Sequence, residues 1–110
     1  MLVMYRTTLA RPAGMTNGEF YGVWLEEAQA TVEALAAGTV KAAWKVPGRD
    51  EVIGVVEVED ADALDRAVQG LPLWSRGYAH LVDRIDWTLL RPYEAWAEDL
   101  QRLARGEPLP

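Results

Sequence analysis

Two side chains of this sequence are suited to proton transfer. Glu27 lies in a predicted helix beside an apolar stripe that includes Phe20 and Trp24. Partial desolvation there would raise the pKa of the Glu27 carboxyl toward the range that suits a general base. His80 is the only histidine, and imidazole is the usual proton carrier near neutral pH. We predict that Glu27 and His80 are catalytic; the alternatives are a solvated surface glutamate and a hydrogen-bonded structural histidine.

Cations and aromatic rings could bind a flat, acidic ligand beside these groups. Lys45 lies near a predicted turn, where it would meet a carboxylate or oxyanion; the alternative is an exposed lysine that discourages strand pairing. Arg6 lies in a predicted central strand, where an unpaired charge is costly, so it binds a ligand anion or pairs with Glu57 or Glu59. Five Trp and four Tyr suit a flat ligand and equally a packed core. The predicted substrate-binding residues are Arg6, Tyr21, Trp24, Trp44, Lys45 and Trp74.

The connection "QGLPLW" supplies one of these rings. It follows a helix that is predicted to end at Gly70, and it places Trp74 just beyond a proline. We predict that the Trp74 indole closes one end of a cleft between the sheet and the helices; packing under a C-terminal helix is the alternative. Tyr21 and Trp24 are three residues apart in a helix, so they either wall the same cleft or pack in the core.

Strands and helices alternate in a simple order. The first helix is predicted from the capping box "TNGE", which begins at Thr16, and from Gly38 as its end. Strands are predicted at residues 1–10, 39–46, 51–59 and 78–90, and helices at residues 17–37, 61–70 and 92–106. The order β-α-β-β-α-β is that of the ferredoxin-like unit, with an extra C-terminal helix. We therefore predict one α+β domain over residues 1–106 and a frayed tail at residues 107–110.

The predicted β-hairpin indicates a second subunit. A four-residue loop at residues 47–50 fits a hairpin better than a two-residue Pro-Gly turn of type II. This loop sets four pairs opposite one another: Trp44 and Ile53, Ala42 and Val55, Ala43 and Gly54, and Lys41 and Val56. Neither face of the hairpin is polar, and two helices cover only one face of a four-stranded sheet. We expect a second copy of the chain on the other face; the alternative is a monomer whose C-terminal helix folds back over the sheet.

Composition excludes several classes of protein. The net charge is −6 and the 11 Lys and Arg are scattered, which argues against a nucleic-acid partner. There is no cysteine, and neither a DxDxDG loop nor a Gly-rich phosphate loop is present, so we expect no metal and no cofactor. The sequence shows neither a signal peptide nor an apolar run long enough for a membrane span. We expect a cytoplasmic protein without a membrane partner.

Several stretches resemble the muconolactone delta-isomerase family over residues 1 to about 74. They are "MLVMYRTTL", "GTVKAAWKVPG", "EVED" leading into "ADALDRAVQGLPLW", and the pair Glu26-Glu27. The resemblance implies a dimeric α+β barrel of high oligomeric state, which moves a proton along an unsaturated lactone without a cofactor. Such a proton shift needs a base near the acidic carbon, a donor for the enolate oxygen and a cation for any substrate carboxylate.

The chain also departs from that family. Met4 stands where the family often has a histidine, Trp74-Ser75-Arg76 replaces a Phe-Pro-Tyr segment, and a C-terminal helix replaces a short polar tail. Three functions are therefore considered. The first is the isomerase, favoured by the gapless resemblance through Leu73. The others, favoured by the missing histidine, are a cofactor-free oxygenase or cyclase acting on aromatic polyketide-like compounds, whose own carbanion would react, and a non-catalytic small-ligand-binding barrel.

Overall fold

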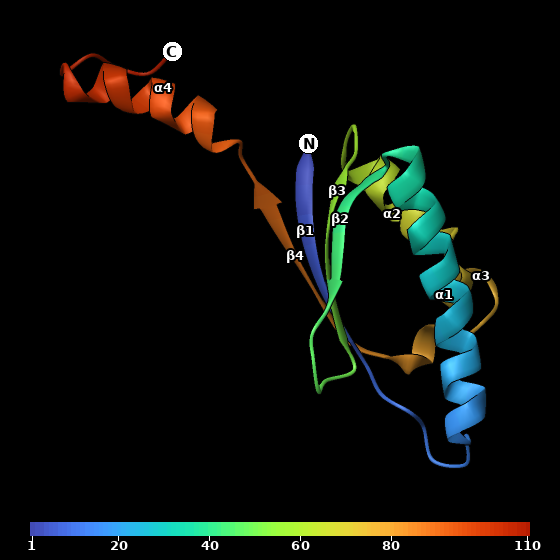
Figure 1. The fold of residues 1–110 in the computed structure, drawn as a ribbon. Helices are drawn as coiled ribbons and strands as arrows, with labels where there is room; N and C mark the ends of the chain where they lie inside the picture. Colours follow the sequence, from blue (N-terminus) through green and yellow to red (C-terminus); the bar gives the residue numbers. More distant parts are fainter.

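Four antiparallel strands and four helices follow the predicted order in the computed structural model, which describes residues 1–110 (Figure 1). The strands are β1 (Leu2–Leu9), β2 (Val40–Lys45), β3 (Glu51–Glu57) and β4 (Val82–Leu90). The helices are α1 (Asn17–Ala37), α2 (Ala61–Gln69), α3 (Pro72–Ser75) and α4 (Tyr93–Ala104), and a 3₁₀ turn, η1, covers Ala79–Leu81. The sheet order is β2-β3-β1-β4. This is the predicted α+β, ferredoxin-like fold.

Local hydrogen bonds fix where α1 begins and ends. The Glu19 N–H donates to the Thr16 hydroxyl oxygen (3.1 Å), and the Thr16 N–H donates to the Glu19 carboxylate (3.2 Å). Gly38 closes the helix with φ of 83°, a conformation that glycine adopts without strain. The predicted capping box is therefore confirmed.

The segment before β4 differs from the prediction. The strand predicted to begin at residue 78 begins at Val82, because Ala79–Leu81 form a 3₁₀ turn. The connection after α2 contains the short helix α3, which has Pro72 in its first turn, where a missing N–H costs nothing. His80 consequently lies in a turn before the strand and not within it.

The β2–β3 hairpin has the predicted loop and most of the predicted register. The Val46 N–H donates to the Glu51 carbonyl oxygen (2.9 Å), which leaves residues 47–50 as the loop. The pairs Trp44–Ile53, Ala42–Val55 and Ala43–Gly54 are confirmed. The pair of Lys41 with Val56 is wrong, because a register shift places Val40 opposite Val56. Lys41 is the extra residue of this bulge, and its ammonium lies 3.4 Å from the Glu57 carboxylate.

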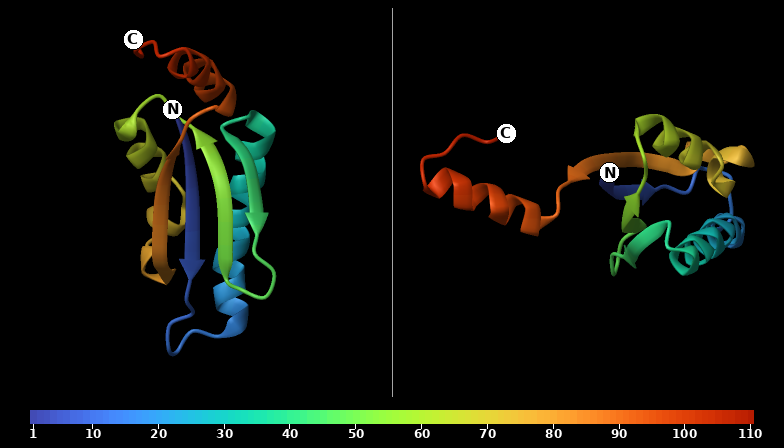
Figure 2. Two further views of the ribbon diagram at one scale, coloured as in Figure 1. Left: turned by 90° about the vertical axis from the view of Figure 1, so that its left-hand side faces the viewer. Right: turned by 90° about the horizontal axis from the view of Figure 1, so that it is seen from above.

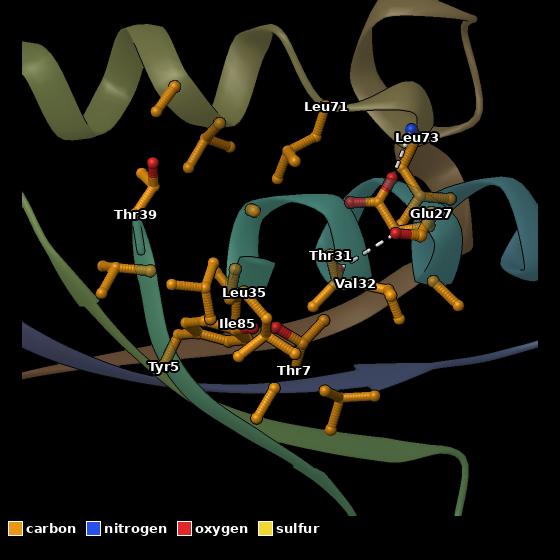
Figure 3. A pocket seen from close by; sticks show the side chains of 18 of the residues that line it. Tyr5, Thr7, Glu27, Thr31, Val32, Leu35, Thr39, Leu71, Leu73 and Ile85 are labelled. Atoms are coloured by element: carbon orange, nitrogen blue, oxygen red, sulfur yellow. Dashed lines mark hydrogen bonds between the residues drawn. The ribbon is translucent and has the colours of Figure 1, made fainter. Parts of the chain in front are cut away.

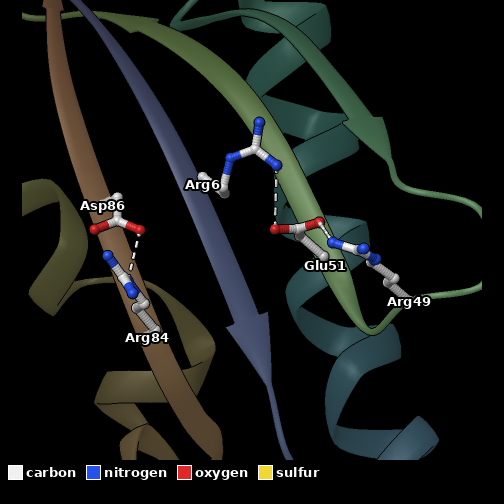
Figure 4. A network of polar contacts seen from close by, with 5 residues as sticks. All are labelled: Arg6, Arg49, Glu51, Arg84 and Asp86. Carbon is white, nitrogen blue, oxygen red and sulfur yellow. Dashed lines mark hydrogen bonds and ion pairs between the residues drawn. The ribbon is translucent and has the colours of Figure 1, made fainter.

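The two faces of the sheet have different surroundings. Helices α1, α2 and α3 lie on one face, and nothing in the chain covers the other (Figure 1). On this open face, the Arg6 guanidinium lies 3.2 Å from the buried carboxylate of Glu51, which is also 3.9 Å from Arg49 (Figure 4). Arg84 and Asp86 form a second ion pair on β4 at 2.8 Å. Arg6 therefore pairs with Glu51, and neither Glu57 nor Glu59 is its partner.

The apolar core is small. It contains Leu9, Phe20, Leu73 and Leu81, each at most 8% exposed, and only 7 of the 110 residues are buried. The core joins the start of α1 to α3 and to η1 at one end of the sheet. Beyond this core, the side chains between the helices and the sheet leave a cavity.

Helix α4 stands away from the body of the molecule (Figures 1 and 2). The principal extents are 62 × 27 × 22 Å, which shows how far the C-terminal region projects. Tyr93, Leu100 and Leu103 are 76%, 41% and 43% exposed. A C-terminal helix folded back over the sheet is thus not observed, and Trp74 does not pack beneath it.

Candidate functional site

A cavity of about 440 Å³ lies between the helix-covered face of the sheet and helices α1, α2 and α3 (Figure 3). Helix α3 packs against both α1 and α2, and all three helices lie on the same side of the sheet (Figure 2). Most of the lining side chains are apolar. A cavity of this size and character is typical of a small-molecule site.

The polar groups of the cavity are few. Its titratable side chains are Tyr5, Glu27 and Lys45, and Thr7, Thr31 and Thr39 add hydroxyl groups. Lys45 is exposed at the end of β2, so its ammonium lies at the rim. Glu27 and Tyr5 are therefore the titratable side chains that lie deeper in the cavity.

Glu27 projects from the middle of α1 toward α3. Its Oε2 accepts a hydrogen bond from the Leu73 N–H (2.9 Å), which joins segments 46 residues apart in sequence (Figure 3). Burial raises the pKa of the Glu27 carboxyl, and the bond from Leu73 offsets part of this rise. The environment is the desolvated one that the apolar stripe of α1 predicted, and it suits a general base.

Tyr5 is a cavity residue that the sequence analysis missed. Its ring lies over Gly54 on the neighbouring strand, so that a Cβ at Gly54 would lie only 2.2 Å from Tyr5 Cζ. The Trp87 ring flanks it, with 6.1 Å between centroids. Burial, and secondarily the negative charge of Glu27, raise the pKa of the Tyr5 phenol. Strand alternation places Tyr5 opposite in direction to Arg6, and the glycine in the middle of β3 was the signal that could have revealed it.

The structure brings most of the predicted site residues together. The cavity is lined by Trp24, Glu27, Trp44, Lys45 and Trp74. Trp74 lies on α3 against the core, so its indole borders the cavity where the sequence predicted. Trp87, which the sequence analysis did not single out, is a fourth tryptophan of the lining.

Arg6, Tyr21 and His80 lie outside the cavity. Arg6 faces the open side of the sheet, where it pairs with Glu51. Tyr21 is 56% exposed on the outer side of α1, stacked beside Trp24. His80 is exposed in the η1 turn, with its ring 6.4 Å from that of Tyr78. Of the two predicted proton carriers, only Glu27 reaches the cavity of this chain.

Metal-ligating side chains do not converge anywhere in the chain: no group of three or more His, Asp or Glu residues is close enough to hold an ion. None of the helices combines the length and apolar character that crossing a membrane requires.

Comparison with known proteins agrees with the fold and identifies the family. The sequence model of muconolactone delta-isomerase matches residues 1–83. A crystal structure of muconolactone isomerase superposes with a TM-score of 0.63 and 22% identity, covering 84% of this chain and 92% of that one. The 5-chloro-2-hydroxyhydroquinone dehydrochlorinase of Burkholderia phenoliruptrix superposes with a TM-score of 0.57 and 15% identity, covering 83% and 94%. No curated protein sequence matches the chain. The match over residues 1–83 shows that the chain belongs to the muconolactone delta-isomerase family.

Proposed function

We propose that this protein is a cofactor-independent isomerase that moves a proton on an unsaturated lactone or a related carbonyl compound. The observation that carries the proposal is the half-buried carboxylate of Glu27, with its raised pKa, in an otherwise apolar cavity. Family membership supports this type of reaction.

The proposed reaction needs one base and no co-reactant. Glu27 removes a proton from the carbon next to the double bond, and the electron pair of that C–H bond moves through the double bond onto the carbonyl oxygen. The resulting enolate then takes the proton back from Glu27 at the carbon next to the carbonyl, and the double bond has moved by one position. A raised pKa brings the carboxylate closer in basicity to the carbon acid.

The walls of the cavity favour a flat ligand. Three of the five tryptophans, Trp24, Trp74 and Trp87, line it from the helix-covered side of the sheet. Trp44, which is 58% exposed, borders it from the edge strand β2. We propose that the Lys45 ammonium at the rim pairs with a carboxylate on the ligand. The similar dehydrochlorinase is described in complex with 2,5-dihydroxybenzoquinone, a flat ring with carbonyl groups. These features support a flat, unsaturated, acidic substrate.

Deuterium exchange tests the proposed reaction directly. The protein is incubated in D₂O with unsaturated lactones that carry an acetate arm, and the products are followed by proton NMR. We expect migration of the double bond, and deuterium at the carbon next to the carbonyl measures how far the proton held by Glu27 exchanges with solvent. Activity should be unchanged when oxygen is removed. Loss of activity without oxygen would favour the cofactor-free oxygenase, and binding without any exchange or rearrangement would favour the non-catalytic barrel.

Replacing Lys45 tests the role of the rim cation. Lys45→Ala should weaken the binding of acidic ligands up to about fivefold, because exposed ion pairs contribute little, and should not affect the methyl esters of the same ligands. Quenching of tryptophan fluorescence reports the binding. Lys41→Ala is the matched control, because Lys41 pairs with Glu57 and does not line the cavity. Equal effects of the two substitutions on binding would show that Lys45 does not contact the ligand.

We also propose that the protein is a homo-oligomer. The open face of the sheet presents Met4, Ile53 and Val55 without any cover from the chain. Helix α4 presents a second uncovered apolar stripe, which includes Leu100. Uncovered apolar surface of this extent is typical of subunit contacts.

Sedimentation at micromolar concentration tests both surfaces. We expect a mass above that of the monomer, which Ile53→Lys reduces. If α4 contributes to the contact, Leu100→Lys reduces the mass as well. Leu25→Lys is the control, because Leu25 is 57% exposed on α1 and belongs to neither surface. A monomeric wild-type protein would rule out the oligomer.

A further inference from the structure

We infer that the Tyr5 hydroxyl donates the hydrogen bond to the oxyanion that forms on the ligand, and that Gly54 is the residue that makes room for it. This inference deepens the proposed function and rests on it, because it assigns the donor of the same site. Neither residue was assigned a role from the sequence.

A donor is needed because the enolate charge forms inside an apolar cavity. In such surroundings a preorganised donor stabilises developing charge far more than water does. Glu27 is the base and is itself negative, and Lys45 is exposed at the rim. The remaining side chains of the lining that can donate are its hydroxyls and the indole N–H groups of its tryptophans. An indole N–H is a much weaker acid than a phenol, so the hydroxyls, which include a phenol, are the stronger candidates.

Among these hydroxyls, that of Tyr5 is the best suited. The Thr31 hydroxyl already donates to the main-chain oxygen of Glu27 (3.0 Å). The hydroxyls of Thr7 and Thr39 are aliphatic and therefore much weaker acids than a phenol, and hydrogen bonds to an oxyanion strengthen with the acidity of the donor. The Tyr5 hydroxyl makes no hydrogen bond within the chain, so it is free to donate to a ligand.

The surroundings keep the Tyr5 phenol protonated while Glu27 is ionised. The titratable groups that share the cavity with Tyr5 are Glu27 on α1 and Lys45 on β2. Burial and the charge of Glu27 both raise the pKa of the Tyr5 phenol. Burial also raises the pKa of the Glu27 carboxyl, but the ordinary pKa of a carboxyl group is far below that of a phenol. A neutral phenol and a carboxylate therefore coexist over a wide pH range, which gives one donor and one base.

Gly54 allows Tyr5 to occupy its position. The two residues are direct partners across the β1–β3 ladder, and the phenol end of the ring lies over the glycine. A Cβ at position 54 would lie 2.2 Å from Cζ and 2.3 Å from the hydroxyl oxygen, which is far inside contact distance. Glycine weakens a strand interior, and its neighbours on the same face, Val52 and Val56, carry large side chains. The missing side chain at Gly54 is thus a space that the tyrosine fills.

Kinetics of two variants test the inference. Tyr5→Phe keeps the ring and removes the donor, so kcat on an unsaturated lactone should fall about 10²–10³-fold with little change in KM. Gly54→Ala should lower kcat as well, because it displaces the hydroxyl. The double variant with Tyr5→Phe should have a kcat close to that of Tyr5→Phe alone, because the donor is already absent. Tyr78→Phe is the control, because Tyr78 packs on the core and does not line the cavity. Thermal melting of each variant shows that it is folded.

A spectroscopic probe gives a readout that does not depend on turnover. Hydroxynitrophenylacetate carries an acetate arm and a phenol. The ionised phenol mimics the enolate oxygen, and its absorption of visible light reports how much of the bound probe is ionised. At a fixed pH, the ionised fraction of the bound probe should fall in Tyr5→Phe and Gly54→Ala relative to wild type and Tyr78→Phe.

The outcomes separate this inference from the proposed function. If Tyr5→Phe changes neither kcat nor the ionised fraction of the probe, Tyr5 is not the donor, even where the isomerase reaction is observed. If no lactone is turned over but the probe responds to Tyr5→Phe, the donor assignment stands and the isomerase proposal fails. If Gly54→Ala behaves as wild type in both assays, Gly54 has no part in positioning the phenol.

Discussion

Glu27→Gln should lower kcat about 10²–10⁴-fold, the range typical of a general base, while the affinity for ligand changes little. Glutamine keeps the size of the side chain, and its carbonyl oxygen can still accept the hydrogen bond from the Leu73 N–H. Only the ability to take a proton is lost, so the cost appears in the transition state. Steady-state kinetics together with tryptophan-fluorescence titration measure the two quantities separately.

Glu26→Gln is the matched control for this experiment. Glu26 precedes Glu27 on the same helix, but its carboxylate pairs with Arg76 at 3.1 Å and does not line the cavity. We expect nearly wild-type kcat for this variant. Equal kinetics of the two variants would show that Glu27 is not the base.

The pH dependence of the reaction should reflect the burial of Glu27. Because burial raises the pKa of this carboxyl, the acid limb of kcat/KM should lie above the range of an ordinary glutamate, and Glu27→Gln should abolish it. The same shift has a consequence for stability. A group with a raised pKa in the folded state stabilises it below the unfolded pKa, and this contribution is lost as the pH rises through the folded pKa. At neutral pH, Glu27→Gln should therefore unfold at the same or a higher denaturant concentration than wild type.

Phe20→Ala should lower the free energy of unfolding by about 3–5 kcal/mol, as is usual for a buried phenylalanine. Phe20 is 2% exposed and belongs to a core of very few side chains, so the loss of its ring removes a large share of the buried apolar contacts. This cost is a large fraction of the 5–15 kcal/mol that is roughly typical of a folded domain. Urea denaturation at a fixed protein concentration measures it.

The adjacent residue supplies the control. Tyr21 is 56% exposed, and Tyr21→Ala should change the free energy of unfolding by about 0.5 kcal/mol or less. A similar loss for both substitutions would mean that a partner subunit covers Tyr21 and that the core extends across the contact.

Much of the fold could be predicted because its boundaries are marked locally. The capping residues around α1 and the loop at residues 47–50 depend on neighbours in the sequence, and each was predicted correctly. The bulge at Lys41 was not, since alternation alone carries no sign of an extra residue. The turn at His80 was missed because residues 78–90 read as one continuous strand.

The candidate site could be predicted only in part. Glu27 was found because helical spacing places it beside an apolar stripe. Arg6 was assigned to the ligand and Tyr5 was overlooked, although the two are adjacent and must face opposite sides of β1. The choice between the sides depends on which face the helices cover, and the pairing of Tyr5 with Gly54 depends on contacts between strands distant in sequence. Neither the covered face of the sheet nor the contact between Tyr5 and Gly54 can be predicted from a local sequence pattern.

The hydrogen bond between Glu27 and Leu73 affects how this site can change in evolution. Its donor is a main-chain N–H, which every residue except proline provides. The attachment of the base therefore places little demand on the side chains of the segment that holds it. Trp74 is the next residue along and forms part of the cavity wall, so mutation there can reshape the wall while the base keeps its anchor. The shape of the cavity can therefore change through one short helix while the Glu27 carboxylate keeps its position.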